Sequence, residues 1–339
     1  MLLLRKANFL VNFAIGILIC TFSLKVHALE LRVAHISNPK IEQQINFAAQ
    51  SWEALLDDPI RVNIQIKFSA LEANIRAHTS AEYVDITFTQ FKQALAADKK
   101  TGADQRFLNN LPSGALYKKL INGTAESAKS HSNQNYVQSN LDTVELTRAN
   151  AKALGLIPAQ NNQIDAVIVI NSSLVNHDQK KLNSANDQVN LQAIIFHEIG
   201  HVLGFVSGVN ILDYFYFYKG AVLSHSEYAK FATPLDFTRC SMESVAAGAD
   251  MDWTVTNREK HFSIDGKCSL PSRIDNAWSR GVYLGDGFEP GHWRNNSGLG
   301  VMVPVSTKPL QLSELERLAF DVIGWDLQNQ NDKLLQKKP

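Results

Sequence analysis

Cysteine, basic charge and long apolar stretches are all in short supply in this sequence. The 339 residues include 3 cysteines, and the 33 lysines and arginines are balanced by 33 acidic residues. Without a basic excess, no electrostatic field attracts nucleic acid or anionic lipid. The apolar run from Phe9 to Leu24 is broken by Asn12 and falls short of the about 20 residues that a membrane-spanning helix needs. We therefore expect neither a nucleic-acid-binding protein nor a membrane-embedded one.

The N-terminus has the pattern of a secretory signal. Arg5 and Lys6 precede the apolar run, and Val26-His27-Ala28 offers a small-residue cleavage site. An uncleaved anchor and a lipoprotein anchor at Cys20 are the alternatives, and the short run and the large residue before Cys20 disfavour them. We expect residues 1–28 to be removed and the protein to be secreted or periplasmic, with no stable membrane association. Cleavage takes away three basic residues, which leaves 30 of the 33 against 33 acidic residues, a net charge of about −3.

The mature chain keeps two cysteines, Cys240 and Cys268. An isolated pair in an exported protein most often forms a disulfide, which is what we expect here. Metal ligation by the two thiolates is the alternative.

Hydrophobic periodicity predicts alternating helices and strands before residue 190. We expect helices where apolar residues recur every three to four positions, and strands where they alternate or run together. This order is typical of an α+β fold with a twisted sheet on one side. Residues 97–142 are polar and poorly periodic, so we expect a surface insertion there with one helix. The predicted helices cover residues 40–55 and 147–154, and the predicted strands cover 61–68, 84–88 and 164–171.

The segment His197-Glu198-Ile199-Gly200-His201 is the most informative part of the chain. Four residues of α-helix advance about 400° and about 6 Å, so His197 and His201 project from one face, one turn apart. Two imidazoles so placed can share one Zn²⁺. Glu198 can then polarise a water molecule at the ion and carry its proton to a leaving amine. The spacing therefore predicts a catalytic zinc site.

The residues around this segment favour a helix over a chance match. Asn190 is a plausible N-cap, Gly204 can end the helix, and residues 171–190 form a polar connection from the preceding strand. Apolar residues recur at helical spacing and give the helix a buried face. They are Leu191, Ile194, Ile195, Val202 and Leu203.

A third metal ligand has to come from elsewhere, because catalytic zinc usually takes three protein ligands plus water. In most metzincins the third histidine lies six residues after the second, and Ser207 occupies that position here. His292 is favoured, because Val301-Met302-Val303-Pro304 follows it and a turn carrying a methionine under the metal belongs to the metzincin arrangement. The other candidates are His225, His261 and carboxylates such as Glu227 and Glu243.

With these residues the chain resembles secreted bacterial zinc metalloproteases whose third histidine is remote, an arrangement similar to leishmanolysin. The resemblance covers most of the mature chain and is densest after residue 190. It implies a zincin-type catalytic domain with a twisted mixed sheet, an active-site helix and an irregular C-terminal lobe with a Met-turn. It also implies zinc on His197, His201 and His292, with Glu198 as the catalytic base and Met302 in the turn. Beyond these residues, it is carried by the segments 233–239, 261–266, 284–287, 300–304 and 318–327.

The resemblance and the residues together predict the organisation of the chain and its function. We expect one catalytic domain over residues 29–327, with an upper lobe over 29–206 and a lower lobe over 207–327, followed by a polar tail. We expect a monomeric, secreted zinc-dependent endopeptidase that acts on proteins or peptides. A secreted binding protein with a structural zinc site and a zinc hydrolase of non-peptide substrates are the alternatives. Glu198 argues against the first, because a structural site needs no carboxylate beside its first ligand.

A last helix is predicted near the C-terminus. Ser313-Glu314-Leu315-Glu316 is a capping box, with Ser313 at the N-cap and Glu316 at position N3. Leu315, Leu318, Ala319 and Val322 would form its apolar face, and Gly324 would close it. We expect its role to be structural.

Overall fold

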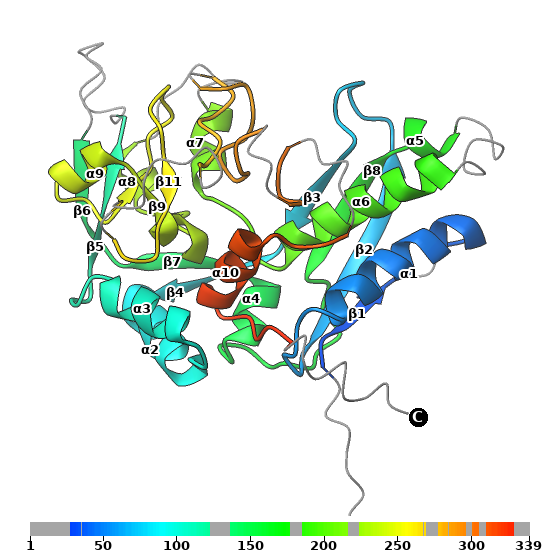
Figure 1. Ribbon diagram of the computed structural model, residues 1–339, viewed down its shortest axis with the longest axis horizontal. Coiled ribbons are helices and arrows are strands. Elements are labelled where there is room, and N and C mark those ends of the chain that lie inside the picture. The colour runs from blue at the N-terminus through cyan, green and yellow to red at the C-terminus, as the bar shows by residue number, and fades with distance from the viewer. Residues whose placement is uncertain are drawn as a thin grey trace, which may run out of the picture.

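The computed structural model describes residues 28–34, 36–122, 136–176, 185–215, 224–266, 268, 277–283, 285–295, 300–304 and 310–328 (Figure 1). The helices are α1 Pro39–Glu53, α2 Phe88–Asp98, α3 Gly102–Asn110, α4 Arg148–Ala153, α5 Ser173–Asn176, α6 Ala185–Val202, α7 Val209–Tyr214, α8 His225–Tyr228, the 3-10 helix η3 Pro234–Thr238, α9 Met242–Ala246 and α10 Glu314–Val322. The strands are β1 Glu30–Val33, β2 Arg61–Ser69, β3 Ala77–Ala81, β4 Tyr83–Thr87, β5 Tyr117–Ile121, β6 Tyr136–Leu141, β7 Thr143–Thr147, β8 Ala166–Asn171, β9 Arg239–Cys240, β10 Met251–Asp252 and β11 His261–Phe262. The fold is α+β, as the sequence predicted.

The largest sheet is mixed and has the strand order β1-β2-β8-β3. Strands β1, β2 and β8 run parallel, whereas β3 pairs antiparallel with β8 and forms an edge. Buried branched residues such as Val62, Ile64 and Ile168 make the inner strands apolar, as expected for strands covered by helices. The edge strand β3 is different, because only small and polar residues form it.

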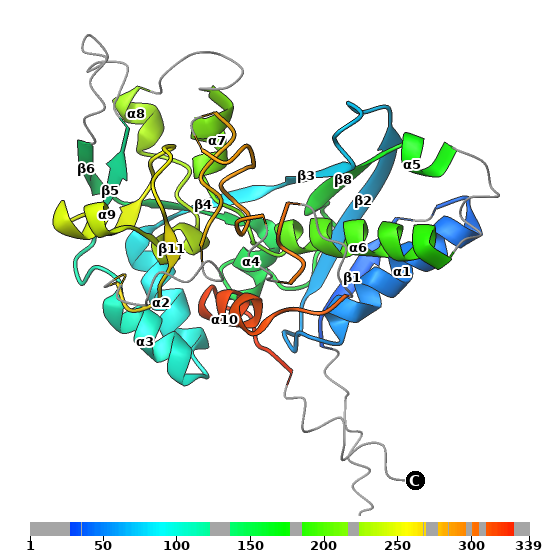
Figure 2. The ribbon, with the colours of Figure 1, turned by 45° about the horizontal axis from the view of Figure 1, so that its top comes forward.

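Helices α1 and α6 lie side by side along this sheet (Figures 1 and 2). Asn38 caps α1 by accepting hydrogen bonds from two backbone amides, and Pro39 occupies its first turn. Trp52 of α1 is fully buried, stacks on Phe196 of α6 at 4.5 Å between ring centroids, and donates its indole N–H to the Phe196 carbonyl at 2.9 Å. This contact fixes α6 against α1 one residue before His197.

A second group of short strands lies on the other side of α10 and α4 in Figure 2. Here β4 pairs with β7, and β10, β5 and β6 form a three-stranded sheet. Because β5 precedes residue 207 and β10 follows it, this sheet joins residues from both of the predicted lobes. The division into two lobes itself stays a prediction.

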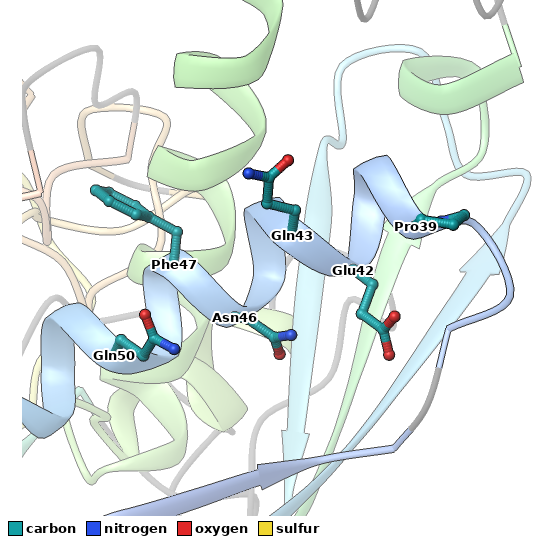
Figure 3. Close-up of a pocket in the computed structure, with 6 residues that line it drawn as sticks. All are labelled: Pro39, Glu42, Gln43, Asn46, Phe47 and Gln50. Atoms are coloured by element: carbon teal, nitrogen blue, oxygen red, sulfur yellow. The ribbon is translucent and has the colours of Figure 1, made fainter.

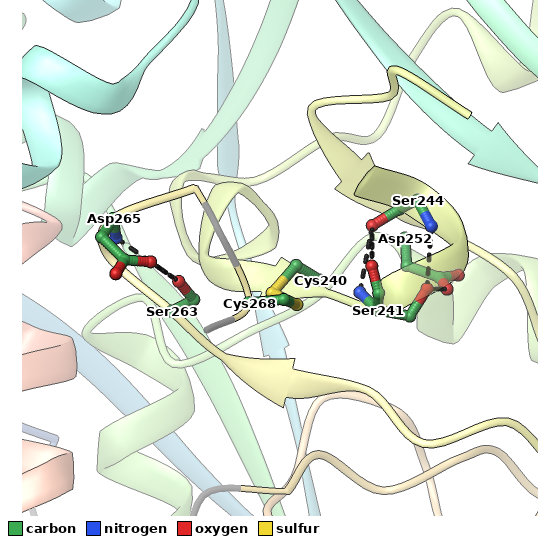
Figure 4. Close-up of a disulfide and its surroundings, with 7 residues drawn as sticks. All are labelled: Cys240, Ser241, Ser244, Asp252, Ser263, Asp265 and Cys268. Carbon is green, nitrogen blue, oxygen red and sulfur yellow. Dashed lines mark hydrogen bonds between the residues drawn. A yellow bond between two sulfur atoms is a disulfide. The ribbon is translucent and has the colours of Figure 1, made fainter. Parts of the chain in front are cut away.

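The predicted disulfide between Cys240 and Cys268 is present (Figure 4). Cys240 lies in β9, which pairs antiparallel with β11. Beside it, Ser241 donates to the buried Asp252, and Ser263 donates to Asp265 at 2.6 Å. The disulfide therefore joins β9 to the chain that leaves β11.

Several sequence predictions hold, and three need correction. The predicted helices 40–55 and 147–154 and strands 61–68 and 164–171 correspond to α1, α4, β2 and β8. Strand 84–88 corresponds to β4, but Phe88 already begins α2, because Thr87 caps that helix. Asn190 is not the N-cap of the histidine helix, since α6 begins five residues earlier, at Ala185.

Residues 97–142 are not only a surface insertion. They contain α3, β5 and β6, and β5 buries Tyr117, Leu120 and Ile121. The sequence did not predict β5 because two lysines interrupt the apolar pattern of Tyr-Lys-Lys-Leu-Ile. One of them, Lys119, is itself fully buried and stands where an apolar residue would be expected. Its ammonium group donates to the carbonyls of Tyr228 and Lys230 and lies 3.5 Å from the centroid of the Trp253 ring. These contacts replace the hydration that the ammonium group loses on burial.

The predicted signal peptide lies, apart from Ala28, outside the described residues. Among the helices that the structure describes, none combines the length and the apolar character needed to cross a lipid bilayer.

Candidate metal centre

Helix α6 presents two histidines from its last two turns. His197 and His201 are separated by one turn, and their Nε2 atoms lie 3.1 Å apart. The helix ends directly afterwards, because Gly204 has a φ of +106° and the Phe205 amide donates back to the Gly200 carbonyl at 3.0 Å. This turn brings the Phe205 carbonyl to His201 Nδ1, at 2.6 Å. The glycine that ends the helix thus also allows the turn that places the Phe205 carbonyl beside His201.

The segment 289–294, here the ligand loop, brings His292 to the same place. Arg239 is fully buried and donates to the Pro290 carbonyl at 3.0 Å, while the Gly291 amide donates to Asn210 Oδ1 at 2.7 Å. The Ser279 amide donates to the His292 carbonyl at 2.9 Å. The loop is irregular, but its backbone is held on each side of the histidine.

The three Nε2 atoms of His197, His201 and His292 form a triangle with sides of 3.1 Å. Nitrogens bound at about 2.0–2.1 Å to a tetrahedral ion lie about 3.3–3.4 Å from one another. The triangle is therefore close to what one metal ion requires, and the three histidines could hold such an ion. Within the described ranges, no other group of three histidine, cysteine or acidic side chains meets the same condition.

The opposite ring nitrogens define the tautomers. Each Nδ1 faces a backbone carbonyl: Val301 at 2.7 Å for His197, Phe205 at 2.6 Å for His201 and Glu289 at 3.3 Å for His292. A carbonyl can only accept, so each Nδ1 carries the proton and each Nε2 presents a lone pair to the centre of the triangle. Three converging lone pairs repel one another, and a cation between them removes that repulsion.

Electrostatics keep the three imidazoles in this neutral form. Burial lowers the pKa of His197, while the Val301 carbonyl and the Glu316 charge act in the other direction. Burial, followed by repulsion from His197, lowers the pKa of His201 to about 3. The pKa of His292 is also well below its ordinary value, for the same two kinds of reason. Neutral imidazole is the form that binds a metal.

The side chain of Glu198, a residue of α6, extends toward the edge strand β3. The residue is only 6% exposed. Burial raises its pKa to about 7, and a hydrogen bond from Thr79 opposes that rise. Thr79 Oγ1 lies 2.7 Å from Glu198 Oε2 and 3.1 Å from the Glu198 carbonyl. The edge strand thus holds one oxygen of a buried carboxylate that follows the first histidine.

The methionine of the C-terminal segment lies under the same helix. Met302 is fully buried, and the space beside Gly200 is so small that a Cβ there would lie 2.5 Å from the methionine sulfur. We call residues 300–304 the Met302 turn. This turn also carries the Val301 carbonyl that contacts His197.

Of the other candidate ligands, those whose side chains the structure describes do not join the cluster. Ser207 donates to the buried carboxylate of Asp236, and His261 lies in β11, paired with Cys240. Of the carboxylates, Glu243 forms an ion pair with Arg258. The side chain of His225 lies outside the described residues.

A separate hollow on the outer side of α1 has no metal-binding character (Figure 3). This one helix supplies the whole lining, in which Glu42 is the single acidic side chain. The six residues are Pro39, Glu42, Gln43, Asn46, Phe47 and Gln50.

Two parts of the site were not predicted from the sequence. Strand β3, with Thr79, has no apolar alternation that would have revealed it. The Val301 carbonyl is a backbone group, and no sequence motif marks such a partner.

Comparison with known proteins adds no further assignment. No protein-family model matches this chain, and neither a curated protein nor a solved structure is significantly similar to it.

Proposed function

We propose that this chain is an exported zinc-dependent endopeptidase of the metzincin type, with His197, His201 and His292 as metal ligands. The observation that carries the proposal is the triangle of three Nε2 lone pairs with a buried carboxylate, Glu198, one residue from the first ligand. Three imidazoles are a common ligand set of catalytic zinc, which keeps a further position open for water or substrate. When bound, such an ion polarises a carbonyl and lowers the pKa of water.

Glu198 is suited to be the general base. Its environment favours a pKa near neutrality, where a carboxylate can both accept a proton and return it. Thr79 holds Oε2, so the other oxygen, Oε1, is the one available to take a proton from the attacking water and deliver it to the leaving amine. A buried carboxylate is costly to the fold, and a purely structural metal site would have no use for it. This consideration favours an enzyme over a binding protein.

An extended peptide fits the surroundings better than a compact substrate. Strand β3 is the edge of its sheet, so its outer backbone groups can pair with an added strand. Thr79 in the same strand contacts Glu198. A peptide paired along β3 would therefore pass beside the proposed base.

The test is a digest of a peptide library by the purified mature protein, with its zinc content measured in parallel. We expect cleavage by the wild type and retained zinc with a loss of about 10²–10⁴-fold in rate for Glu198→Gln, because the amide cannot accept the proton. Equal rates for the two proteins would contradict the role of Glu198. A zinc-loaded wild type that cleaves no peptide would contradict the endopeptidase, and hydrolysis of a non-peptide amide would then favour the alternative hydrolase.

A further inference from the structure

Glu316 has contacts that its place in a helix cap does not require. It is fully buried at position N3 of α10. Its Oε2 accepts hydrogen bonds from the Ser313 amide at 2.7 Å and the Ser313 hydroxyl at 2.9 Å, which complete the capping box. Its Oε1 accepts from the Met302 amide at 2.6 Å, outside the helix. One carboxylate therefore joins the start of α10 to the Met302 turn.

The peptide group that Glu316 binds is the one that His197 also binds. The Met302 N–H and the Val301 C=O belong to the same planar unit. The N–H donates to Glu316, and the C=O accepts from His197 Nδ1 at 2.7 Å. A carboxylate, a peptide group and an imidazole thus follow one another in a single hydrogen-bonded series.

Such a series has a consequence for metal binding. An anion at the N–H polarises the peptide group, makes its carbonyl a stronger acceptor and strengthens the next hydrogen bond. A stronger acceptor at Nδ1 fixes the ring orientation and raises the basicity of Nε2, as carboxylates bonded directly to metal-binding histidines do.

The carboxylate of Glu316 packs closely against the Met302 turn. A Cβ at Gly300 would lie 1.8 Å from Glu316 Oε2, so the carboxylate is pressed against the backbone of the turn. In another capping box of this chain, Thr101–Asp104, the N3 carboxylate is partly exposed and accepts from local amides. Full burial at Glu316 therefore reflects the contact with the Met302 turn rather than the cap.

We infer that Glu316 is a positioning residue of the metal centre, which orients and polarises His197 through the Val301–Met302 peptide group. This inference rests on the proposed metal role of His197. It does not require that the bound metal cleave peptides.

Three variants separate the positioning role from the cap. Glu316→Gln removes the charge, and Glu316→Asp keeps the charge but shortens the reach to Met302, while Asp104 shows that aspartate can serve at N3. Ser313→Ala is the matched control, because it removes the capping hydroxyl and leaves the bond between Glu316 and Met302. The measurements are Zn²⁺ affinity by competition with a chelating indicator and the visible absorption of the Co²⁺-loaded protein.

We expect both Glu316 variants to weaken Zn²⁺ binding by about 10–100-fold, which is the typical effect of losing a group that hydrogen-bonds to a metal ligand. Both variants should also alter the Co²⁺ spectrum. Ser313→Ala should lower the melting temperature and leave affinity and spectrum as in the wild type. Equal affinities in all four proteins, or an equal loss in Ser313→Ala, would overturn the positioning role. A wild type without bound Zn²⁺ would instead overturn the proposed metal site, which tells the two failures apart.

Discussion

Met302 packs against α6 at Gly200, the glycine between His197 and His201. A Cβ at position 200 would come within 2.5 Å of the Met302 sulfur and 3.3 Å of the Trp52 ring. The helix that carries the histidines and the turn that carries the Val301 carbonyl are therefore in direct contact, with no room for another atom between them.

We predict that Gly200→Ala destabilises the protein although alanine favours helices. Overpacking in a filled core costs about 1–3 kcal/mol, against a gain of up to about 1 kcal/mol from helix propensity. Thermal unfolding of Gly200→Ala and of Gly200→Ala/Met302→Ala measures the contact, because the smaller residue at 302 makes room for the new methyl group. Gly102→Ala, at the start of α3 and with nothing within 4 Å of the new atom, is the control and should be neutral or slightly stabilising. The contact is refuted if both glycine variants melt alike.

His292→Ala should lose bound zinc, whereas His261→Ala should keep it. Two imidazoles hold zinc weakly and leave an extra position for water. His261 is paired in β11 and stands outside the triangle. Metal analysis of the two variants after dialysis gives the comparison. Full zinc retention in His292→Ala would exclude it as a ligand.

Thr79→Val should lower kcat without changing the zinc content. Thr79→Ser keeps the hydroxyl and should have a kcat close to that of the wild type. The valine keeps the shape but cannot donate to Glu198, and a hydrogen bond to a charged group is worth about 1.5–3 kcal/mol, or about 10–100-fold in rate. Steady-state kinetics on a peptide cleaved by the wild type measure kcat and KM separately. A loss in both variants would point to strand packing rather than to the hydroxyl.

Replacing both Cys240 and Cys268 by serine should reduce the free energy of unfolding by about 3 kcal/mol, because the disulfide restricts the unfolded chain. Urea titration of the oxidised wild type and the double variant gives the difference. Non-reducing peptide mapping of the wild type comes first, and two free thiols in exported protein would contradict the linkage.

Because of Asp58, the protein should become less stable as the pH rises from about 4 to about 8. Burial, and then the charge of Asp326, raise its pKa from 3.8 to about 8. A carboxyl group with a raised folded-state pKa contributes fully below pH 3.8, and its contribution is lost as the pH rises to about 8.

Asp58→Asn removes this loss, because the asparagine side chain does not ionise. Its amide oxygen can still accept the hydrogen bond from the Asp326 amide that Asp58 accepts at 2.9 Å. We expect the variant to melt a few degrees above the wild type at pH 8 and close to it at pH 4, since about 1 kcal/mol shifts Tm by about 2–4 °C. Asp57→Asn, at the exposed neighbouring position, should follow the wild type at both values.

The sequence predicted best those features that depend on local spacing. The turn between His197 and His201, the capping box of Ser313 and the glycine end of α6 all follow from a few adjacent residues. The disulfide followed from the lack of any other cysteine in the mature chain. In each of these cases few alternatives were physically available.

Features set by distant contacts were harder to predict. β5 was missed because its buried lysine finds carbonyl partners that only the folded chain provides. Thr79 lies in an edge strand whose register is fixed by pairing with β8, far along the sequence. Glu316 was expected to cap a helix, and its second partner, the Met302 amide, becomes visible only when the turn is packed against it.

The triangle of histidines spans a long stretch of chain, since His292 follows His201 by 91 residues and His197 by 95. A cation bound between them would act as a cross-link from α6 to the ligand loop, in parallel with the disulfide between Cys240 and Cys268. Unlike the disulfide, such a cross-link would form and break with the concentration of free metal, so part of the binding free energy would add to the stability of the fold. Resistance to heat and to proteolysis should therefore rise with free zinc, and chelation should loosen the chain before any covalent bond changes.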